Sequence, residues 1–115
     1  MTLREKQSTF VKLIALLIDE ATSLGYELTF GEAYRSKEEA EKLSKLGLGI
    51  KNSLHTIRLA IDLNLFKDGI YLTKTNDYTE LGEWWERMST SDYICAWGGR
   101  FNDGNHFSIS HNGRK

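Results

Sequence analysis

The chain has 115 residues, of which 40% are hydrophobic and 27% charged, the balance of a globular rather than a disordered protein. Its 15 basic and 16 acidic residues give a formal net charge of −1, which argues against binding nucleic acid or an anionic membrane through bulk electrostatics. The one cysteine, Cys95, excludes an internal disulfide framework and a multi-cysteine zinc cluster. We therefore expect one domain over residues 1–115, acting as a monomer and without a nucleic-acid partner.

The chain carries no pattern typical of export or of membrane insertion. Its longest apolar run, residues 13–18, is too short to span a bilayer. The first residues lack the basic start, the apolar stretch and the small-residue cleavage site of a signal peptide. These features predict synthesis in the cytoplasm without a signal peptide and no stable membrane insertion.

The first part of the chain predicts two helices with a short strand between them. A Thr-x-x-Glu spacing opens an apolar pattern at helical steps, which predicts a helix over residues 2–24 ended by Gly25. Residues 26–30 alternate as a short strand does. A Ser-x-x-Glu spacing then opens a second helix over residues 36–46, ended by Gly47.

The second part predicts strands around one further helix. Residues 59–66 alternate as a strand does, and the turn at 67–69 predicts a hairpin with 70–73 as its partner. A helix is predicted over 79–88 and a last strand over 106–110. This order favours an α+β fold, a small antiparallel sheet packed with about three helices.

The most informative segment places a carboxylate inside an apolar strand. Asp62 would be costly to bury without a partner, by several kcal/mol even after relaxation. The pattern alone leaves open that Asp62 lies on the solvent face of an edge strand and that His55 is an ordinary loop residue.

A second cluster, late in the chain, supplies the partner groups. His106 opens a predicted strand directly after a turn, and Asp103 precedes it by three residues. Together, His55, Asp62 and His106 would form the two-histidine, one-carboxylate ligand set of a catalytic zinc site. Asp103 is then the candidate general base.

The order and spacing of these residues resemble the zinc D-Ala-D-Ala carboxypeptidase and L-alanyl-D-glutamate endopeptidase family. That family includes the VanX- and VanY-type peptidases and many small bacteriophage endolysins. Its pattern is Ser-x-His, followed after six further residues by Asp. Later in the chain comes a second element, either Asp-x-x-His or Glu-x-x-His. The chain matches this pattern with Ser53, His55 and Asp62, and then with Asp103 and His106.

An upstream block, residues 31–36, resembles the Tyr-Arg-Ser element of the family, whose arginine lies at the active site. The resemblance implies a compact α+β fold, similar to that of the D-Ala-D-Ala peptidases and hedgehog domains, and Zn²⁺ as the cofactor. It also implies three metal ligands, His55, Asp62 and His106. Asp103 would be the general base, and Arg35 would stabilise an oxyanion or bind a substrate carboxylate. Ser53 is predicted to fix the ligand loop or to bind substrate, rather than to act as a nucleophile.

One position departs from the family. Many members have glycine three residues after the first ligand, where this chain has Arg58. This leaves open whether the Arg58 side chain points to solvent or forms one wall of the substrate groove, and it bears on subsite preference more than on metal binding.

The resemblance implies a zinc metallopeptidase that hydrolyses peptidoglycan stem peptides, either at L-Ala-D-Glu or at D-Ala-D-Ala. The resemblance also fits a phage endolysin, which would reach the host cell wall after its release. One alternative is a zinc-containing module that binds wall peptides without cleaving them, although Asp103 argues against a pure binder. Another is a metal-dependent nuclease, suggested by His106 and His111 and disfavoured by the charge balance.

The remaining distinctive residues have structural interpretations. His111 lies an odd number of residues after the candidate ligand of its strand, so it should face the opposite side. Trp84 and Trp85 are adjacent, so we expect only one of them in the core. We expect Trp97 to serve packing and Cys95 to be a buried, unreactive thiol.

Overall fold

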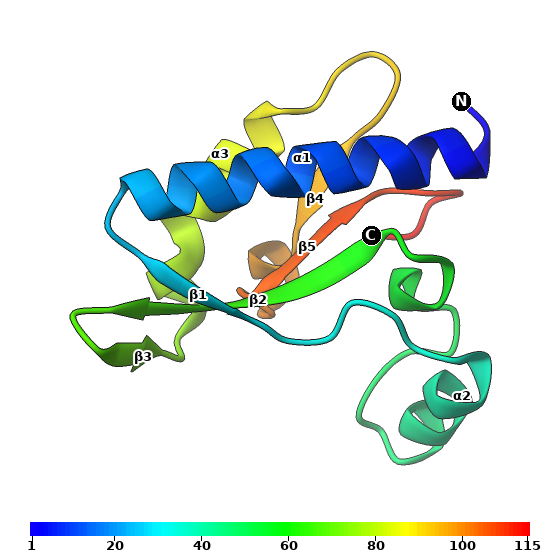
Figure 1. Ribbon diagram of the computed structural model, residues 1–115. Helices are drawn as coiled ribbons and strands as arrows, with labels where there is room; N and C mark the ends of the chain where they lie inside the picture. Colours follow the sequence, from blue (N-terminus) through cyan, green and yellow to red (C-terminus); the bar gives the residue numbers. More distant parts are fainter.

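A computed structural model describes residues 1–115 (Figure 1). It contains three α-helices, five strands and three short 3₁₀-helices. In chain order they are α1 (Leu3–Ser23), β1 (Glu27–Phe30), α2 (Lys37–Lys45), η1 (Leu54–Ile57), β2 (Ala60–Lys67), β3 (Ile70–Leu72), η2 (Thr75–Tyr78), α3 (Thr79–Arg87), β4 (Cys95–Trp97), η3 (Gly98–Phe101) and β5 (His106–Ile109). The α+β fold predicted from the sequence is confirmed.

Both predicted helix starts carry the capping contacts that their sequences indicate. The Thr2 hydroxyl accepts a hydrogen bond from the Glu5 amide at 3.1 Å, and the Glu5 carboxylate accepts one from the Thr2 amide at 2.9 Å. At α2 the Ser36 hydroxyl accepts from the Glu39 amide at 3.0 Å. These bonds satisfy amides that a helix leaves unpaired in its first turn.

The strands form one antiparallel sheet in the order β1-β2-β5-β4, with β3 pairing with β2 as a hairpin. The hairpin turns at Asp68 and Gly69, whose positive φ angles of 52° and 78° suit a tight two-residue turn. The strand β4 was not predicted. All three of its residues are buried, so it lacks the alternation that indicates a half-buried strand.

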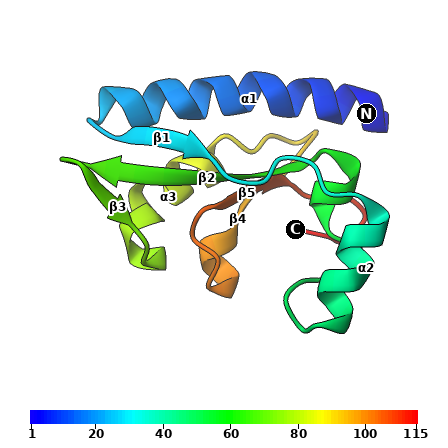
Figure 2. The ribbon, with the colours of Figure 1, turned by 60° about the horizontal axis from the view of Figure 1, so that its bottom comes forward.

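The hydrophobic core lies on one face of the sheet, beneath α1 and α3. Inward-facing residues of β2 pack there against the buried stripe of α1. Trp85 of α3 is fully buried, and its indole donates to the carbonyls of Ala96 and Ser108 at 3.0 and 3.1 Å. It thereby ties α3 to β4 and β5. Figure 2 shows α2 and η3 projecting from the other side of the sheet, away from α1.

None of the helices combines the length and apolar character needed to cross a bilayer.

Candidate metal centre

Asp62 and His106 occupy directly opposite positions in the antiparallel pairing of β2 and β5. Opposed residues in such a pair share one face of the sheet. The neighbouring residues Ile61 and Phe107 pack into the core, so Asp62 and His106 point to the other face. The third residue, His55, reaches the same face from η1, in the loop that precedes β2.

The three side chains converge on one point. Asp62 Oδ1 lies 3.4 Å from His55 Nε2 and 3.6 Å from His106 Nδ1, and one possible ligand atom from each of the three residues lies within 4.8 Å of the other two. Ligand atoms in a tetrahedral zinc shell are about 3.3 Å apart, given metal–ligand distances of about 2.0–2.1 Å. Asp62 Oδ1 is also buried without a hydrogen-bond partner. An orphaned carboxylate oxygen between two imidazoles fits a bound divalent cation.

The loop that carries His55 is fixed at both ends. The buried Ser53 hydroxyl accepts a hydrogen bond from the His55 amide at 3.2 Å, which caps η1. At the other end, Arg58 adopts a left-handed conformation with φ 58° and closes the turn. Glycine adopts this conformation without steric cost, which gives a physical reason for the family's glycine here. The Arg58 guanidinium instead stacks on the ring of Tyr34, 4.1 Å from its centroid.

The second nitrogen of His55 faces the segment that follows β1. His55 Nδ1 lies 3.4 Å from the carbonyl oxygen of Ala33 and 4.0 Å from Glu32 Oε1. A carbonyl at this nitrogen fixes the ring so that Nε2 faces Asp62. The same segment supplies Arg35, whose Nε donates to Glu32 Oε1 at 2.5 Å and whose side chain is only 14% exposed. Glu32 and Arg35 thus form an ion pair beside His55.

Neighbouring groups shift the pKa values of Asp62 and His55. Burial opposes ionisation of Asp62, but the imidazoles of His106 and His55 outweigh it and lower the pKa of Asp62 to about 2. Burial likewise disfavours protonation of His55, yet the Asp62 carboxylate and the Ala33 carbonyl raise its pKa overall. A carboxylate that stays ionised between two histidines is the state that metal binding requires.

Asp103 lies at the rim of the centre, on the side of β5. Its Oδ2 is 3.9 Å from His106 Nδ1, and its side chain is 53% exposed. Burial raises the pKa of Asp103 and the Asp62 carboxylate adds to that effect, although His106 opposes it. A carboxylate with a raised pKa, open to solvent and beside the candidate ligands, can accept a proton.

Two further residues shape this rim. A Cβ at Gly98 would lie 2.1 Å from the Asp103 carbonyl oxygen and 2.6 Å from His106 Cβ, so only glycine fits. The Phe101 ring packs edge-on against the His106 ring, 5.6 Å between centroids. Nothing in the sequence indicated that Phe101 contacts His106.

The other candidate residues lie apart from the centre. His111 forms a bridge with Arg114, and its Nδ1 is 3.2 Å from Lys6 Nζ. Trp97 is buried, and its indole donates to the Gly104 carbonyl at 2.7 Å. Cys95 is buried, and burial raises the pKa of its thiol to about 11, as expected for an unreactive cysteine.

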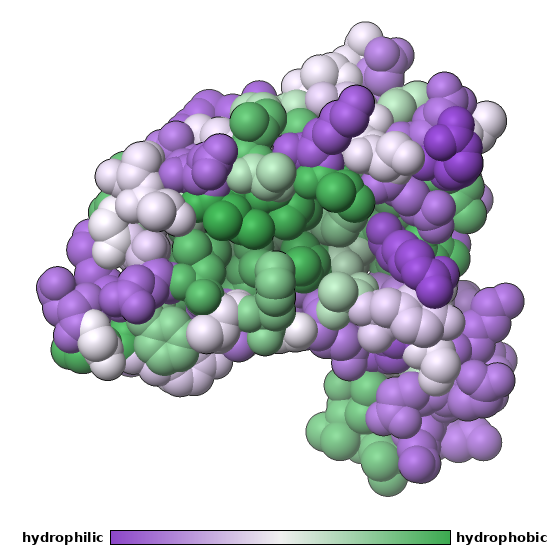
Figure 3. Space-filling model, in the orientation of Figure 1, coloured by the Kyte–Doolittle hydropathy of each residue, from purple (hydrophilic) through white to green (hydrophobic).

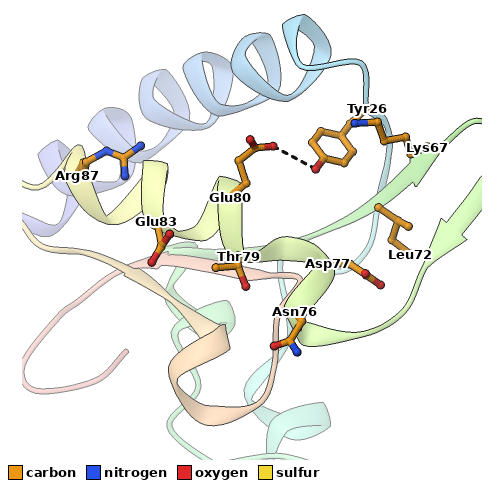
Figure 4. Close-up of a pocket in the computed structure, with 9 residues that line it drawn as sticks. All are labelled: Tyr26, Lys67, Leu72, Asn76, Asp77, Thr79, Glu80, Glu83 and Arg87. Atoms are coloured by element: carbon orange, nitrogen blue, oxygen red, sulfur yellow. Dashed lines mark hydrogen bonds between the residues drawn. The ribbon is translucent and has the colours of Figure 1, made fainter.

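Two cavities of the protein lie away from the metal centre. A polar cavity of about 690 Å³ lies beside α3, where the Tyr26 hydroxyl donates to Glu80 (Figure 4). An apolar groove of about 490 Å³ lies between α1 and the strands, and apolar side chains gather there in the space-filling view (Figure 3). Neither is lined by His55, Asp62, Asp103 or His106.

Comparison with known proteins agrees with this geometry. A family model described as D-alanyl-D-alanine carboxypeptidase matches residues 48–109, more than half of the chain. Among solved structures, the L-Ala D-Glu endopeptidase ChiX of Serratia marcescens has a similar fold, with a TM-score of 0.72 at 20% sequence identity. The match covers 90% of this chain and 79% of that one. Comparison with curated protein sequences gives no match. The matched residues include all three converging side chains and Asp103, and the chain belongs to the D-alanyl-D-alanine carboxypeptidase family of metallopeptidases.

Proposed function

We propose that this peptidase is zinc-dependent and hydrolyses the stem peptides of bacterial peptidoglycan, at the L-Ala-D-Glu or the D-Ala-D-Ala bond. The observation that carries the proposal is the convergence of one ligand atom each from His55, Asp62 and His106 within 4.8 Å, with the Asp103 carboxylate beside them. Two imidazoles and one carboxylate are the donor set that catalytic zinc sites use.

The three converging residues would hold the metal, and each is oriented before the ion binds. Asp62 and His106 are set by strand pairing, and His55 by the Ser53 cap and the Ala33 carbonyl. A divalent ion in this position supplies Lewis acidity, which polarises the scissile carbonyl and lowers the pKa of water. The fixed ligand geometry reduces the reorganisation that binding would otherwise require.

Asp103 is the proposed general base. It faces the same space as the ligands but keeps an exposed carboxylate, so substrate and water can reach it. In the proposed reaction Asp103 accepts a proton from the attacking water and passes it to the leaving amine. Its raised pKa brings it closer to the pH at which it must both take up and release that proton.

Arg35 supplies the positive charge of the proposed substrate site. Its backbone amide donates to the His55 carbonyl at 3.2 Å, so it lies beside a ligand, and its charge acts on both His55 and Asp103. The pairing with Glu32 uses Arg35 Nε, so the terminal nitrogens remain for a substrate carboxylate or a developing oxyanion. Stem peptides carry such carboxylates.

The test is metal analysis together with product analysis. Elemental analysis of the purified protein should give one zinc per chain, and mass spectrometry of products from defined muropeptides should show one cleaved bond. Chelation should abolish cleavage and added zinc should restore it. Cleavage that persists in metal-free protein would disprove the proposal, and binding of muropeptides without cleavage would favour the wall-peptide binding module.

We extend the proposal to biological role: a bacteriophage endolysin that reaches the host wall from the cytoplasm once another protein has opened the membrane. The resemblance to small phage endolysins supports it. Bacteria that express the chain should keep their turbidity until the membrane is permeabilised and then lyse. An Asp103→Asn variant expressed to the same level should not lyse them. Lysis without permeabilisation would contradict this route.

A further inference from the structure

Uncharged polar side chains extend from the metal centre along β2, and the proposed chemistry does not use them. Asn64 lies on the same face of β2 as Asp62, two residues further on. Asn105 directly precedes His106, and its Nδ2 donates to Asn64 Oδ1 at 3.2 Å. The Tyr71 hydroxyl of β3 donates to the same oxygen at 3.4 Å. We call Asn64, Asn105 and Tyr71 the amide shelf.

The amide shelf is continuous with the position of the proposed base. A polar cavity of about 170 Å³ has Asp103, Asn105 and Tyr71 among its lining residues. Asn105 is half-buried and Tyr71 is 49% exposed, so a ligand in the cavity can reach the polar atoms of these two residues, while Asn64 holds them in place through its Oδ1. A substrate in contact with Asp103 therefore has the shelf beside it.

The shelf and Arg35 lie on opposite sides of Asp62. On one edge of β2, the Gly31 amide donates to the Asp62 carbonyl and the Asp62 amide to the Glu32 carbonyl, which places the Arg35 segment there. On the other edge, the Leu63 amide donates to the Asn105 carbonyl at 2.9 Å. A peptide that crosses the metal centre thus meets a cation on one side and neutral amides on the other.

The chemistry of the two sides differs in a way that suits a peptide substrate. A side-chain amide both donates and accepts hydrogen bonds, as a peptide bond does, and it carries no charge. Asn105 uses its Nδ2 within the shelf, whereas no group of the protein donates to its Oδ1. That oxygen is free to accept from an incoming N–H. Arg35 instead matches a carboxylate.

We propose that the amide shelf binds the peptide bond on the acyl side of the scissile bond, while Arg35 holds the carboxylate of the residue that supplies the leaving amine. The proposal rests on the proposed function and orients the substrate in that site. It suits both candidate bonds, because γ-linked D-Glu and terminal D-Ala each carry a free α-carboxylate on the leaving side. It requires an N-acylated substrate rather than a free dipeptide.

The experiment compares matched substrates with and without that acyl-side amide. kcat/KM is measured for the dipeptides L-Ala-D-Glu and D-Ala-D-Ala, each with a free amino group and in its N-acetylated form. The zinc-loaded wild type should prefer the N-acetylated form of the bond that it cleaves. Asn105→Ala should lower this preference about three- to tenfold, the value of one neutral hydrogen bond. A purely structural disturbance would slow both forms equally and leave the ratio unchanged.

Asn76→Ala is the matched control, because Asn76 is exposed on η2, outside the shelf and the metal centre, and it should keep the wild-type preference. If Asn105→Ala does not fold, Tyr71→Phe at an exposed position tests the same shelf, with a smaller loss expected. Absence of a preference in the wild type, or its retention in these shelf variants, would overturn the proposal.

Failure of the proposed function gives a different result, since zinc-loaded wild type would then cleave neither form. Calorimetric titration with the N-acetylated and free dipeptides would in that case decide the shelf proposal alone. Tighter binding of the N-acetylated form that Asn105→Ala removes would support it, and equal binding would overturn it.

Discussion

Asp62 and His106 face each other across the β2–β5 pairing, with 3.6 Å between Oδ1 and Nδ1. The register of the sheet therefore places two of the three proposed ligands before any metal binds. A slip of one residue would turn each side chain of the moved strand to the other face. The third ligand, His55, depends on a loop, and the loop contacts decide how well it is placed.

We predict that Ser53→Ala weakens metal binding. The substitution removes the hydroxyl that caps η1 at the His55 amide, so the His55 ring loses part of its support. We expect the zinc affinity to fall roughly 10- to 100-fold and the free energy of unfolding to fall by about 1 kcal/mol. Competition with a chelator and urea denaturation measure the two quantities. Ser53→Thr should retain most of both, and the exposed Ser91→Ala should change neither.

Asp103→Asn should keep the metal and lose hydrolysis. The amide is nearly isosteric with the carboxylate but cannot accept the proton, so we expect turnover to fall by about 100-fold or more. Zinc content by elemental analysis should remain that of the wild type. Asp19→Asn, on the exposed face of α1, is the control. Zinc-loaded Asp103→Asn with near wild-type turnover would exclude Asp103 as the base.

The metal-free protein should lose stability in acid through Asp62. The pKa of this carboxyl is about 2 in the folded protein and near 3.8 in an unfolded chain, so the folded state binds the proton less well. The stabilisation, about 2 kcal/mol, is fully present above pH 4 and disappears as the pH falls towards 2. Urea unfolding midpoints in the presence of a chelator should show this loss. Asp62→Asn should flatten the pH dependence, and an unchanged slope would contradict the pairing.

Arg58 allows a direct test of the left-handed turn after η1. Arg58→Ala keeps the positive φ and loses the stacking on Tyr34, whereas Arg58→Gly loses the stacking but adopts the conformation freely. We expect the glycine variant to unfold with a free energy about 0.5–1 kcal/mol higher than the alanine variant. Chemical denaturation of the two variants side by side measures the difference. A more stable alanine variant would show that φ is not what constrains this position.

The sequence predicted the elements that have a local signal. Capping spacings marked α1 and α2, and alternation marked β2 with Asp62 on its outer face. The ordered Ser-x-His, Asp and Asp-x-x-His pattern identified the residues that the fold brings together. Each of these signals is contained in a few consecutive residues or in a motif.

The features that the sequence did not predict depend on tertiary contacts. The Ala33 carbonyl that orients His55 is a backbone group and has no residue signature. The Phe101 ring reaches His106 only because Gly98 lets η3 lie against β5. The amide shelf joins Asn64 and Asn105, which are 41 positions apart in the chain. Such contacts follow from strand register, which no local pattern specified.

The two-sided architecture of the sheet is useful for protein engineering. The helix α1 covers the face opposite to the metal centre, and the N-terminus lies at one end of that helix (Figure 2). A targeting module or an immobilisation tag fused there would lie behind the sheet and leave the substrate's approach open. An attachment on the loop between α2 and η1 would instead lie next to Arg35, because a Cβ at Gly49 of this loop would lie 3.4 Å from Arg35 Nη1.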